Sequence, residues 1–350
     1  MTDPIVVASS RGSYPVLVAD GALAGLRDIV RGGAVFAVAG AGVLEHHRDR
    51  IEEAIGRETL IAIQDGEGAK TLASIEALVE VLIARGARRD STVVAIGGGT
   101  VGDSAGFAAS ILFRGVDLVH VPTTLLAQID SSIGGKVGIN HPRGKNLIGS
   151  FWPPRAVVVD PAFLATLPPA EFLSGAFEAL KCGVILDEAL FDLVRGEYHT
   201  VGSSLEEVVR RAIAVKAAIV SEDERERDRR RLLNYGHTIG HAIEAAIGFG
   251  TLTHGEAVAW GMIGANAIAA RRGLLPPRER NRIDGAVRGL SPRLPDAIER
   301  SQVLAAAGTD KKITARGRAM ALPLRVGECA IVEDVSDEEL RIGIDAALAG

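Results

Sequence analysis

Residues 92–112 read TVVAIGGGTVGDSAGFAASIL, and this stretch decides the fold class. The apolar run Thr92–Ile96 predicts a buried strand, and the three glycines after it predict a tight turn into a helix over Ser104–Leu112. A strand, a glycine turn and a helix N-terminus let backbone N–H groups approach a pyrophosphate. The spacing is not G-x-G-x-x-G, so a tight αβ turn without a ligand is an alternative. Asp103 is unusual in a phosphate cradle and is suited to bonding a ribose or nicotinamide group.

The stretch belongs to a longer alternation of strands and helices that fills the first half of the chain. Apolar positions in Ala69–Arg85 recur at helical spacing, as expected for a helix that covers a sheet. Such alternation predicts a mostly parallel, Rossmann-like sheet in an α/β nucleotide-binding domain over residues 1–160. The other predicted strands are Ile5–Ala8, Val16–Val18, Val35–Val38, Leu60–Ile63, Leu118–Val121 and Ala156–Val159.

The second half of the chain reads differently, because strand signals become rare after Pro161. Pro153-Pro154 and Pro168-Pro169 bracket a domain boundary near residue 160. We therefore predict an all-α C-terminal domain over residues 161–350. Its predicted helices are Glu171–Leu186, Ser204–Glu222, Leu233–Ile247, Glu256–Arg272 and Asp337–Leu348.

Composition excludes several classes of protein. The 39 basic and 44 acidic residues give a net charge of −5, which does not favour a nucleic-acid partner. Cys182 and Cys329 are the only cysteines, too few for a disulfide scaffold or a thiolate metal cage. The chain opens without a signal-type segment, and no apolar run approaches the roughly 18 residues of a membrane span. We expect a cytoplasmic protein with no membrane partner.

Histidines gather in one part of the predicted helical domain. His237 and His241 are four residues apart, so both side chains lie on one face of a helix and can reach one cation. His254 precedes the next predicted helix, and Glu178 could add a carboxylate. A pair of polar neighbours with no ligand is the alternative reading of the His237/His241 spacing.

Several cations stand beside glycine, asparagine or apolar residues rather than in charged runs. Each could be an ordinary surface residue. Together with one metal, they match what a small substrate that carries both a phosphate and a carboxylate requires. These cations are Arg114, Lys136, Lys145, Lys181, Lys216, Arg230, Lys311 and Lys312, of which only Arg230 lies in a charged run.

Seven motifs in order give the chain a family resemblance, collinear from about Gly66 to Lys312. DSSIGGK at 130–136, GKNLIG at 144–149 and LNYGHTIGH at 233–241 carry most of it. GGGTVGD at 97–103, VPTT at 121–124, TLP at 166–168 and HGE at 254–256 extend it. The sequence resembles the 3-dehydroquinate synthases, which belong to the sugar phosphate cyclases.

The resemblance implies a two-domain enzyme with an NAD-binding α/β domain and an α-helical domain that binds metal and substrate. It implies the conversion of 3-deoxy-D-arabino-heptulosonate 7-phosphate to 3-dehydroquinate and phosphate in the shikimate pathway. The implied steps are oxidation, β-elimination of phosphate, reduction, ring opening and intramolecular aldol closure. It further implies NAD, one divalent metal (usually Zn²⁺, with Co²⁺ as the alternative), and a homodimer.

The resemblance also assigns roles to residues of this chain. It makes Glu178, His237 and His254 the metal ligands and moves His241 to the substrate. Its catalytic residues are Lys136, Asn146, Lys181, Arg230 and His241, and its other substrate residues are Arg114, Asp130, Lys145, Lys216, Asn234, Lys311 and Lys312. Its cofactor residues are Glu67, Lys70, Gly98, Gly99, Asp103, Thr123, Thr124, Asp130, Lys136, Lys145 and Thr166.

One departure from the family pattern concerns the cofactor. The family commonly has an acidic residue after the strand equivalent to Val35–Val38, where this chain reads Ala39-Gly40-Ala41-Gly42. The choice between NAD and NADP therefore stays open at this point. Three alternative functions remain: a sister cyclase acting on sedoheptulose 7-phosphate, a metal-dependent polyol dehydrogenase that releases NADH, and a catalytically dead scaffold.

Overall fold

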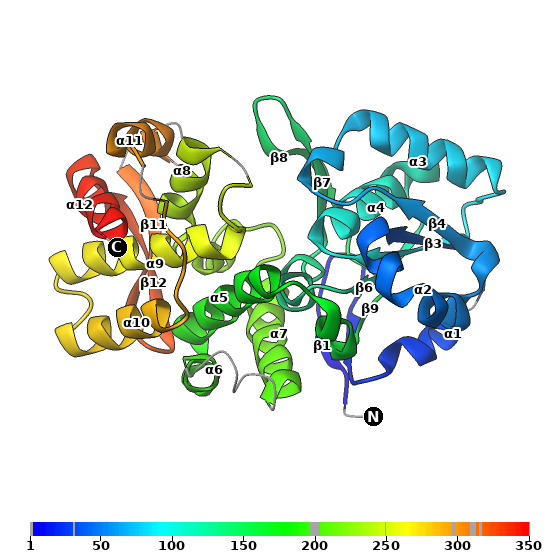
Figure 1. The fold of residues 1–350 in the computed structure, drawn as a ribbon, viewed down its shortest axis with the longest axis horizontal. Helices are drawn as coiled ribbons and strands as arrows, with labels where there is room; N and C mark the ends of the chain where they lie inside the picture. Colours follow the sequence, from blue (N-terminus) through cyan, green and yellow to red (C-terminus); the bar gives the residue numbers. More distant parts are fainter. Residues whose placement is uncertain are drawn as a thin grey trace. The chain divides into compact units, whose positions relative to one another are not determined.

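The structure, a computed structural model, describes residues 3–30, 32–195, 204–248, 250–295, 298–308, 313–314 and 317–349. The chain divides into two compact units, Met1–Pro168 and Pro169–Gly350 (Figure 1). The sequence placed a domain boundary after residue 160. The short 3₁₀ helix Pro161–Thr166 lies with the first unit because Phe163 is buried in its core.

The first unit is built on a seven-stranded sheet in the order β1-β2-β9-β6-β5-β3-β4. Only β1 is antiparallel to its neighbour, and the other pairs are parallel. All seven predicted strands are confirmed, with ends shifted by at most two residues. Their bounds are β1 Ile5–Val7, β2 Tyr14–Val18, β3 Val35–Gly40, β4 Leu60–Ile63, β5 Thr92–Gly97, β6 Asp117–Pro122 and β9 Ala156–Val159.

Both faces of this sheet are buried, and side chains alternate between two cores. In β5, Val93 and Ala95 point into one core, whereas Val94 and Ile96 point into the other. Helices α3 (Leu72–Ala84) and α4 (Gly99–Ile111) cover the first face. Helices α1 (Leu26–Ile29) and α2 (Ala41–Ile55) cover the second. Burial on both faces explains why these strands are nearly continuous apolar runs.

The glycine turn after β5 is tighter than predicted. Gly98 is the N-cap of α4, so the helix begins at Gly99 rather than at Ser104. A Cβ on Gly97 would lie 2.6 Å from the Cβ of Val101, so only glycine lets the first turn of α4 pack against the end of β5.

A two-stranded antiparallel hairpin, β7 (Lys136–His141) and β8 (Gly144–Phe151), also belongs to the first unit. It was not predicted, because glycine and charged residues in these motifs give little strand signal. Val137 and Ile139 anchor the hairpin in the core beside α4. Packing, rather than intrinsic propensity, therefore makes these residues strands.

Helices dominate the second unit, as predicted. The predicted helices are all present, and α6, α10 and α11 were missed. The bounds are α5 Pro169–Leu186, α6 Glu188–Val194, α7 Leu205–Glu222, α8 His237–Ile247, α9 His254–Arg271, α10 Pro277–Gly289, α11 Arg300–Gly308 and α12 Asp337–Leu348.

The prediction of an all-α second domain needs one correction. Strands β10 (Ile313–Thr314), β11 (Gly317–Arg325) and β12 (Glu328–Val335) form an antiparallel sheet. β11 and β12 contain charged residues and a proline, so the alternation of apolar and polar residues expected of a strand is weak in their sequences. In the structure, β11 contacts α9. The helical unit therefore carries a small sheet.

Helix α9 forms the centre of the second unit and is buried from Gly255 to Ala269. It packs closely against α8, since a Cβ on Gly261 would lie 1.8 Å from the carbonyl oxygen of Gly236. This close approach brings the N-terminal residues of α8 and α9 together. Among the residues that the structure describes, no helix is both long and apolar enough to cross a bilayer.

Candidate metal and cofactor site

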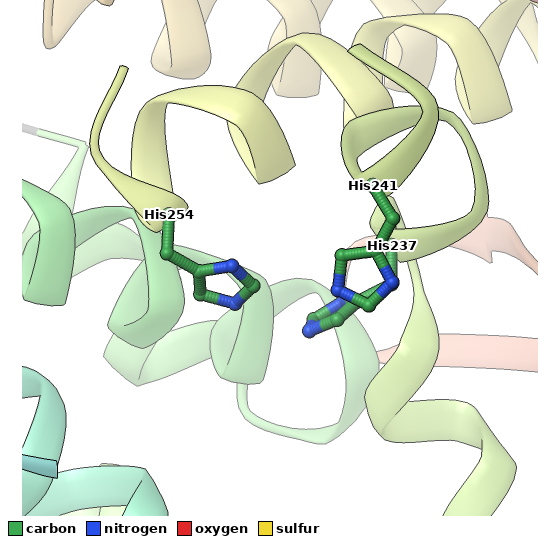
Figure 2. Close-up of side chains that lie close together, drawn as sticks. All are labelled: His237, His241 and His254. Atoms are coloured by element: carbon green, nitrogen blue, oxygen red, sulfur yellow. The ribbon is translucent and has the colours of Figure 1, made fainter. Parts of the chain in front are cut away.

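Three histidines of the second unit point toward one another (Figure 2). Each offers a ring nitrogen within 4.8 Å of those of the other two: His237, His241 and His254. His237 and His254 are the first residues of α8 and α9, and His241 follows one turn later on α8. Gly236, at φ 80°, turns the chain into α8, and Thr253 caps α9. The spacing prediction that the His237 and His241 side chains share one face is confirmed.

A buried carboxylate faces two of these histidines. Oε1 of Glu178 lies 3.9 Å from Nε2 of His237 and 3.6 Å from Nε2 of His254. Glu178 is 1% exposed, and its Oε1 has no hydrogen-bond donor within the described residues. Its Oε2 pairs with Lys181, one turn further along α5. A buried carboxylate with an oxygen aimed at two imidazoles matches the donor set that binds Zn²⁺.

The surroundings of the His237 and His254 imidazoles also favour binding of a cation. Burial, together with the positive charge of Lys181, holds the pKa of His237 well below its usual value, so its ring is neutral. Burial lowers the pKa of His254, but Glu244 and Glu178 outweigh this effect and raise it. A metal ion that binds neutral imidazole would replace the proton that these carboxylates attract.

Buried cations are a second feature of this unit. Lys181, Lys216 and Arg230 are 1%, 6% and 2% exposed. Arg230 lies in the 3₁₀ helix Arg229–Asn234, where its backbone N–H donates to Asp223. Asn234, at the end of that helix, donates to Glu226 at 2.5 Å. Buried charge of this kind is costly, and it is typical of sites that bind anionic ligands.

In the first unit, Lys70 contacts residues of two of the predicted motifs, GGGTVGD and GKNLIG. It is 3% exposed, and its Nζ lies 2.7 Å from Oδ2 of Asp103 and 2.5 Å from Oδ1 of Asn146. Glu67 lies 3.7 Å from the same nitrogen. Burial raises the pKa of Asp103 to about 6, although Lys70 opposes the shift. The structure thus brings together four predicted residues from three separate segments.

Predicted cofactor residues also line the turn after β5. A Cβ on Gly98 would lie 3.1 Å from Cγ2 of Thr124, and one on Gly99 would lie 3.1 Å from Oγ of Ser131. The N–H of Thr123 donates to the carbonyl of Gly97 at 3.0 Å. The turn is therefore closely packed on this side, and a larger side chain would crowd the start of α4.

Comparison with known proteins identifies the family. The family model described as 3-dehydroquinate synthase N-terminal matches residues 60–174, and the one described as 3-dehydroquinate synthase C-terminal matches residues 175–313. The chain belongs to the 3-dehydroquinate synthase family. One relative, named 3-dehydroquinate synthase, from Bradyrhizobium sp., is 40% identical, covering 99% of this chain and 97% of its own.

Two solved structures resemble this family member over their whole lengths. A 2-deoxy-scyllo-inosose synthase, complexed with carbaglucose-6-phosphate, NAD+ and Co2+, is 29% identical with a TM-score of 0.89, over 99% of this chain and 100% of that chain. A 2-epi-5-epi-valiolone synthase from Streptomyces hygroscopicus, with NAD+ and Zn2+ bound, is 30% identical with a TM-score of 0.86, over 99% of each chain.

Several other residues that the 3-dehydroquinate synthase resemblance selects lie in short helical turns and in the β7–β8 hairpin of the first unit. Thr166 Oγ1 lies 2.7 Å from Nε2 of His47, a residue that the sequence analysis missed. Lys136 is exposed at the start of β7, and Arg114 is exposed at φ 68°. Asp130 lies in the π-helical turn Ala127–Ser131, and Lys145 is half-buried at the start of β8. Lys311 and Lys312 lie outside the described residues.

Asp65 is an acidic residue that the sequence analysis did not single out. It follows β4, which pairs with β3 in the sheet. Its carboxylate accepts a hydrogen bond from the N–H of Gly42, and a Cβ on Gly40 would lie 1.9 Å from Oδ1. Asp65 thus supplies an acidic group at the turn where the family's own acidic residue is absent. The signal was available, because carboxyl ends of adjacent parallel strands meet at one edge of a sheet.

Proposed function

We propose that this chain converts 3-deoxy-D-arabino-heptulosonate 7-phosphate to 3-dehydroquinate and phosphate, with NAD and one divalent metal. The observation that carries the proposal is the buried Glu178 carboxylate facing His237 and His254, at 3.9 Å and 3.6 Å, in a member of the 3-dehydroquinate synthase family. Membership of the 3-dehydroquinate synthase family favours phosphate elimination over net oxidation at this site.

In this proposal Glu178, His237 and His254 hold the metal, Zn²⁺ or Co²⁺. When bound, the metal polarises substrate oxygens, and NAD accepts a hydride and returns it within one turnover. Lys181 forms an ion pair with Glu178 in this buried position. His241, which is exposed, is assigned to the substrate phosphate rather than to the metal.

The first unit supplies the cofactor residues. Gly98 and Gly99 leave the N-terminus of α4 open to a pyrophosphate, whose charge the helix dipole favours. Asp103, held by Lys70, accepts hydrogen bonds from the nicotinamide part of the cofactor. Asp65 bonds the adenosine ribose and so favours NAD over NADP. The remaining contacts come from Glu67, Thr123, Thr124, Asp130, Lys136, Lys145 and Thr166.

The family resemblance assigns the substrate contacts to cations and polar side chains. Lys136, Asn146, Arg230 and His241 bind the phosphate and stabilise its negative charge while it takes a proton from the neighbouring carbon and leaves. Lys181 and Lys216 bind the carboxylate and hydroxyl groups. Arg114, Asp130, Lys145, Asn234 and the pair Lys311/Lys312 complete the set of proposed substrate contacts. The protein's main contribution is position and a preorganised positive field.

The proposal includes three organisational features. The first unit, Met1–Pro168, forms the NAD-binding domain, and the second, Pro169–Gly350, forms the metal- and substrate-binding domain. The protein acts as a cytoplasmic homodimer, as the family resemblance implies. Light scattering of the purified protein tests the dimer, and a monomer at micromolar concentration would contradict it.

A coupled assay tests the reaction. The Zn²⁺-loaded protein receives catalytic NAD and 3-deoxy-D-arabino-heptulosonate 7-phosphate, and phosphate, 3-dehydroquinate and NADH are followed together. We expect equal amounts of phosphate and 3-dehydroquinate with no net NADH. NADH that accumulates with turnover would instead identify a dehydrogenase.

A sister cyclase is the second candidate, because both solved cyclases named above resemble this chain over its full length. Its substrate would be sedoheptulose 7-phosphate, which lacks the carboxylate. Turnover of that compound, without turnover of the heptulosonate, would overturn the first proposal.

A further inference from the structure

Glu244 of α8 contacts His254 on the side away from Glu178. Oε2 of Glu244 lies 3.5 Å from Nδ1 of His254, and the Glu244 side chain is 6% exposed. Positions 237, 241 and 244 lie on one face of α8, because residues three and four apart are neighbours on a helix. The helix therefore presents Glu244 to the same region as its two histidines.

We propose that Glu244 is a positioning residue that orients the imidazole of His254 for metal binding, an inference that rests on the proposed metal centre. His254 has a carboxylate oxygen near each ring nitrogen: Glu244 at Nδ1 and, 3.6 Å away, Glu178 at Nε2. A carboxylate at Nδ1 holds the hydrogen on that nitrogen. The lone pair of Nε2 then points toward Glu178.

His237 is oriented in the same way by a different group. Its Nδ1 lies 3.3 Å from the carbonyl oxygen of Tyr235, and its Nε2 faces Glu178. Both proposed imidazole ligands thus have an acceptor at Nδ1 and Nε2 directed to the same carboxylate. Only for His254 is this acceptor a charged side chain, Glu244. Substitution of Glu244 can therefore remove the contact that orients the His254 ring.

The backbone of His254 is fixed without Glu244. Thr253 and Glu256 form a capping box at the start of α9. Arg293 binds Glu256 through Nε at 2.7 Å and Nη2 at 2.9 Å. These contacts set where α9 begins, whereas the Glu244 contact acts on the ring. Substitution of Glu244 should therefore change ring orientation and leave the helix start intact.

The test is the Zn²⁺ affinity of the full chain, measured by competition with a chromophoric chelator. We expect Glu244→Ala to weaken binding by about 10- to 100-fold, the usual effect of removing a carboxylate behind a histidine ligand. Glu244→Gln keeps an oxygen that accepts from Nδ1–H and should lose less. The absorption spectrum of the Co²⁺-loaded protein should shift in Glu244→Ala, because the ligand field depends on the ring's orientation.

Asp284→Asn is the matched control. Asp284, on α10 of the same unit, accepts a hydrogen bond from Asn266 at 2.6 Å and pairs with Arg280 at 3.2 Å. This variant should lower the melting temperature of the metal-free protein without changing Zn²⁺ affinity. A purely structural role for Glu244 would make Glu244→Ala behave like Asp284→Asn.

Zn²⁺ affinity of Glu244→Ala within twofold of wild type would overturn the proposal, as would an equal loss in Asp284→Asn. The proposed reaction can be contradicted independently of the proposed role of Glu244. A wild-type protein that binds Zn²⁺ but makes no 3-dehydroquinate contradicts the reaction alone, and the affinity comparison still decides the role of Glu244. A wild-type protein that binds no Zn²⁺ would overturn both.

Discussion

The ammonium nitrogen of Lys70 lies 2.7 Å from the Oδ2 atom of Asp103, although the two residues are 33 positions apart in the sequence. Lys70 precedes α3, whereas Asp103 lies in the second turn of α4. Burial raises the pKa of Asp103 to about 6, and Lys70 keeps it from rising further. The pair therefore sets the charge at the proposed nicotinamide end of the cofactor site.

Removal of this cation should weaken NAD binding. In Lys70→Met we expect the pKa of Asp103 to rise above about 6, so that the carboxyl is largely protonated at pH 7 and accepts hydrogen bonds poorly. Titration calorimetry should show a loss of NAD affinity of roughly tenfold at pH 7. Wild-type affinity should itself fall as the pH drops below 6.

Arg85→Met is the control for this prediction, since Arg85 is an exposed cation of the same unit that donates to the carbonyl of Leu60. Its NAD affinity should equal that of wild type. Unchanged NAD affinity in Lys70→Met between pH 6 and pH 8 would refute the role of the pair.

Asp65 should decide the choice of cofactor. Its carboxylate lies at the turn between β3 and α2, where it would bond a ribose hydroxyl and repel a 2′-phosphate. Asp65→Asn should shift the NAD-to-NADP affinity ratio toward NADP by roughly tenfold, as expected for loss of one charged hydrogen bond. Asp90→Asn, an exposed carboxylate elsewhere in the unit, is the control. An unaltered ratio in Asp65→Asn would place the ribose elsewhere.

Substitutions can distinguish the proposed metal ligands from His241, the third histidine of the cluster. With Glu178, His237 and His254 as ligands, Glu178→Ala should weaken Zn²⁺ binding by about 100-fold or more, since even residues behind the ligands contribute up to that much. His241→Ala should keep the metal and lose turnover. His46→Ala, an exposed histidine of α2, is the control for unspecific Zn²⁺ binding. Metal loss in His241→Ala but not in Glu178→Ala would make the three histidines the ligands.

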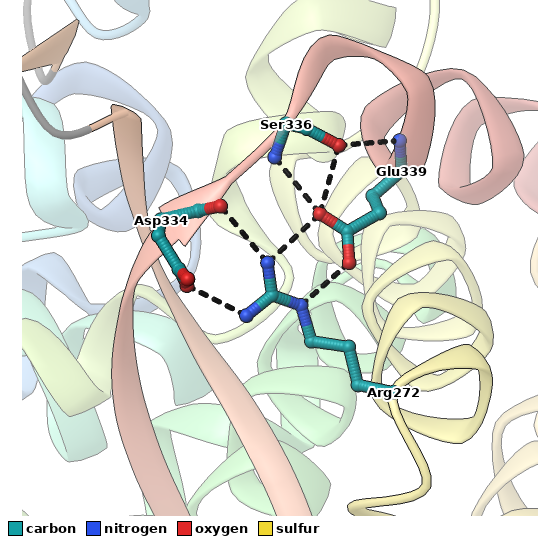
Figure 3. Close-up of polar contacts among 4 residues, drawn as sticks. All are labelled: Arg272, Asp334, Ser336 and Glu339. Atoms are coloured by element: carbon teal, nitrogen blue, oxygen red, sulfur yellow. Dashed lines mark hydrogen bonds and ion pairs between the residues drawn. The ribbon is translucent and has the colours of Figure 1, made fainter.

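A partly buried ion pair should stabilise the second unit in a pH-dependent way. Arg272 at the end of α9 binds Glu339 through Nε at 2.6 Å and Nη2 at 2.8 Å, and it also contacts Asp334 (Figure 3). Arg272, with the capping N–H of Ser336, lowers the pKa of Glu339 to about 2. The folded pKa lies below the unfolded one, so this stabilisation is complete above about pH 4.5 and is lost as the pH falls toward 2.

Arg272→Met should therefore lower the free energy of unfolding by about 2 kcal/mol at pH 7, a value reduced from the full shift because the pair is partly exposed. Urea unfolding at pH 7 and pH 3 measures it, and the difference from wild type should shrink at pH 3. Arg325→Met breaks an exposed pair with Glu328 and should lower the free energy of unfolding much less, because exposed ion pairs contribute little to stability. Equal losses at both pH values would contradict the assignment.

The sheet of the first unit was predictable because each of its strands is a short β-branched run bounded by turn residues. Residues 136–151 were not predictable as a hairpin, since their strand character comes from the packing of Val137 and Ile139 against the core. The small sheet of the second unit was not predicted for a related reason. β12 is only partly buried, so its apolar residues do not form a clear strand pattern in the sequence.

The sequence by itself determined which chemistry is available: a glycine turn at a helix N-terminus, histidines at spacing four, and cations outside charged runs. These depend on residue type and local order, which are properties of the chain alone. Only the tertiary structure decided that Glu178 of α5 faces both His237 and His254, and that Asp65 reaches the turn after β3. Such contacts join residues distant in sequence, and they depend on how closely elements pack, as the glycines between α8 and α9 allow.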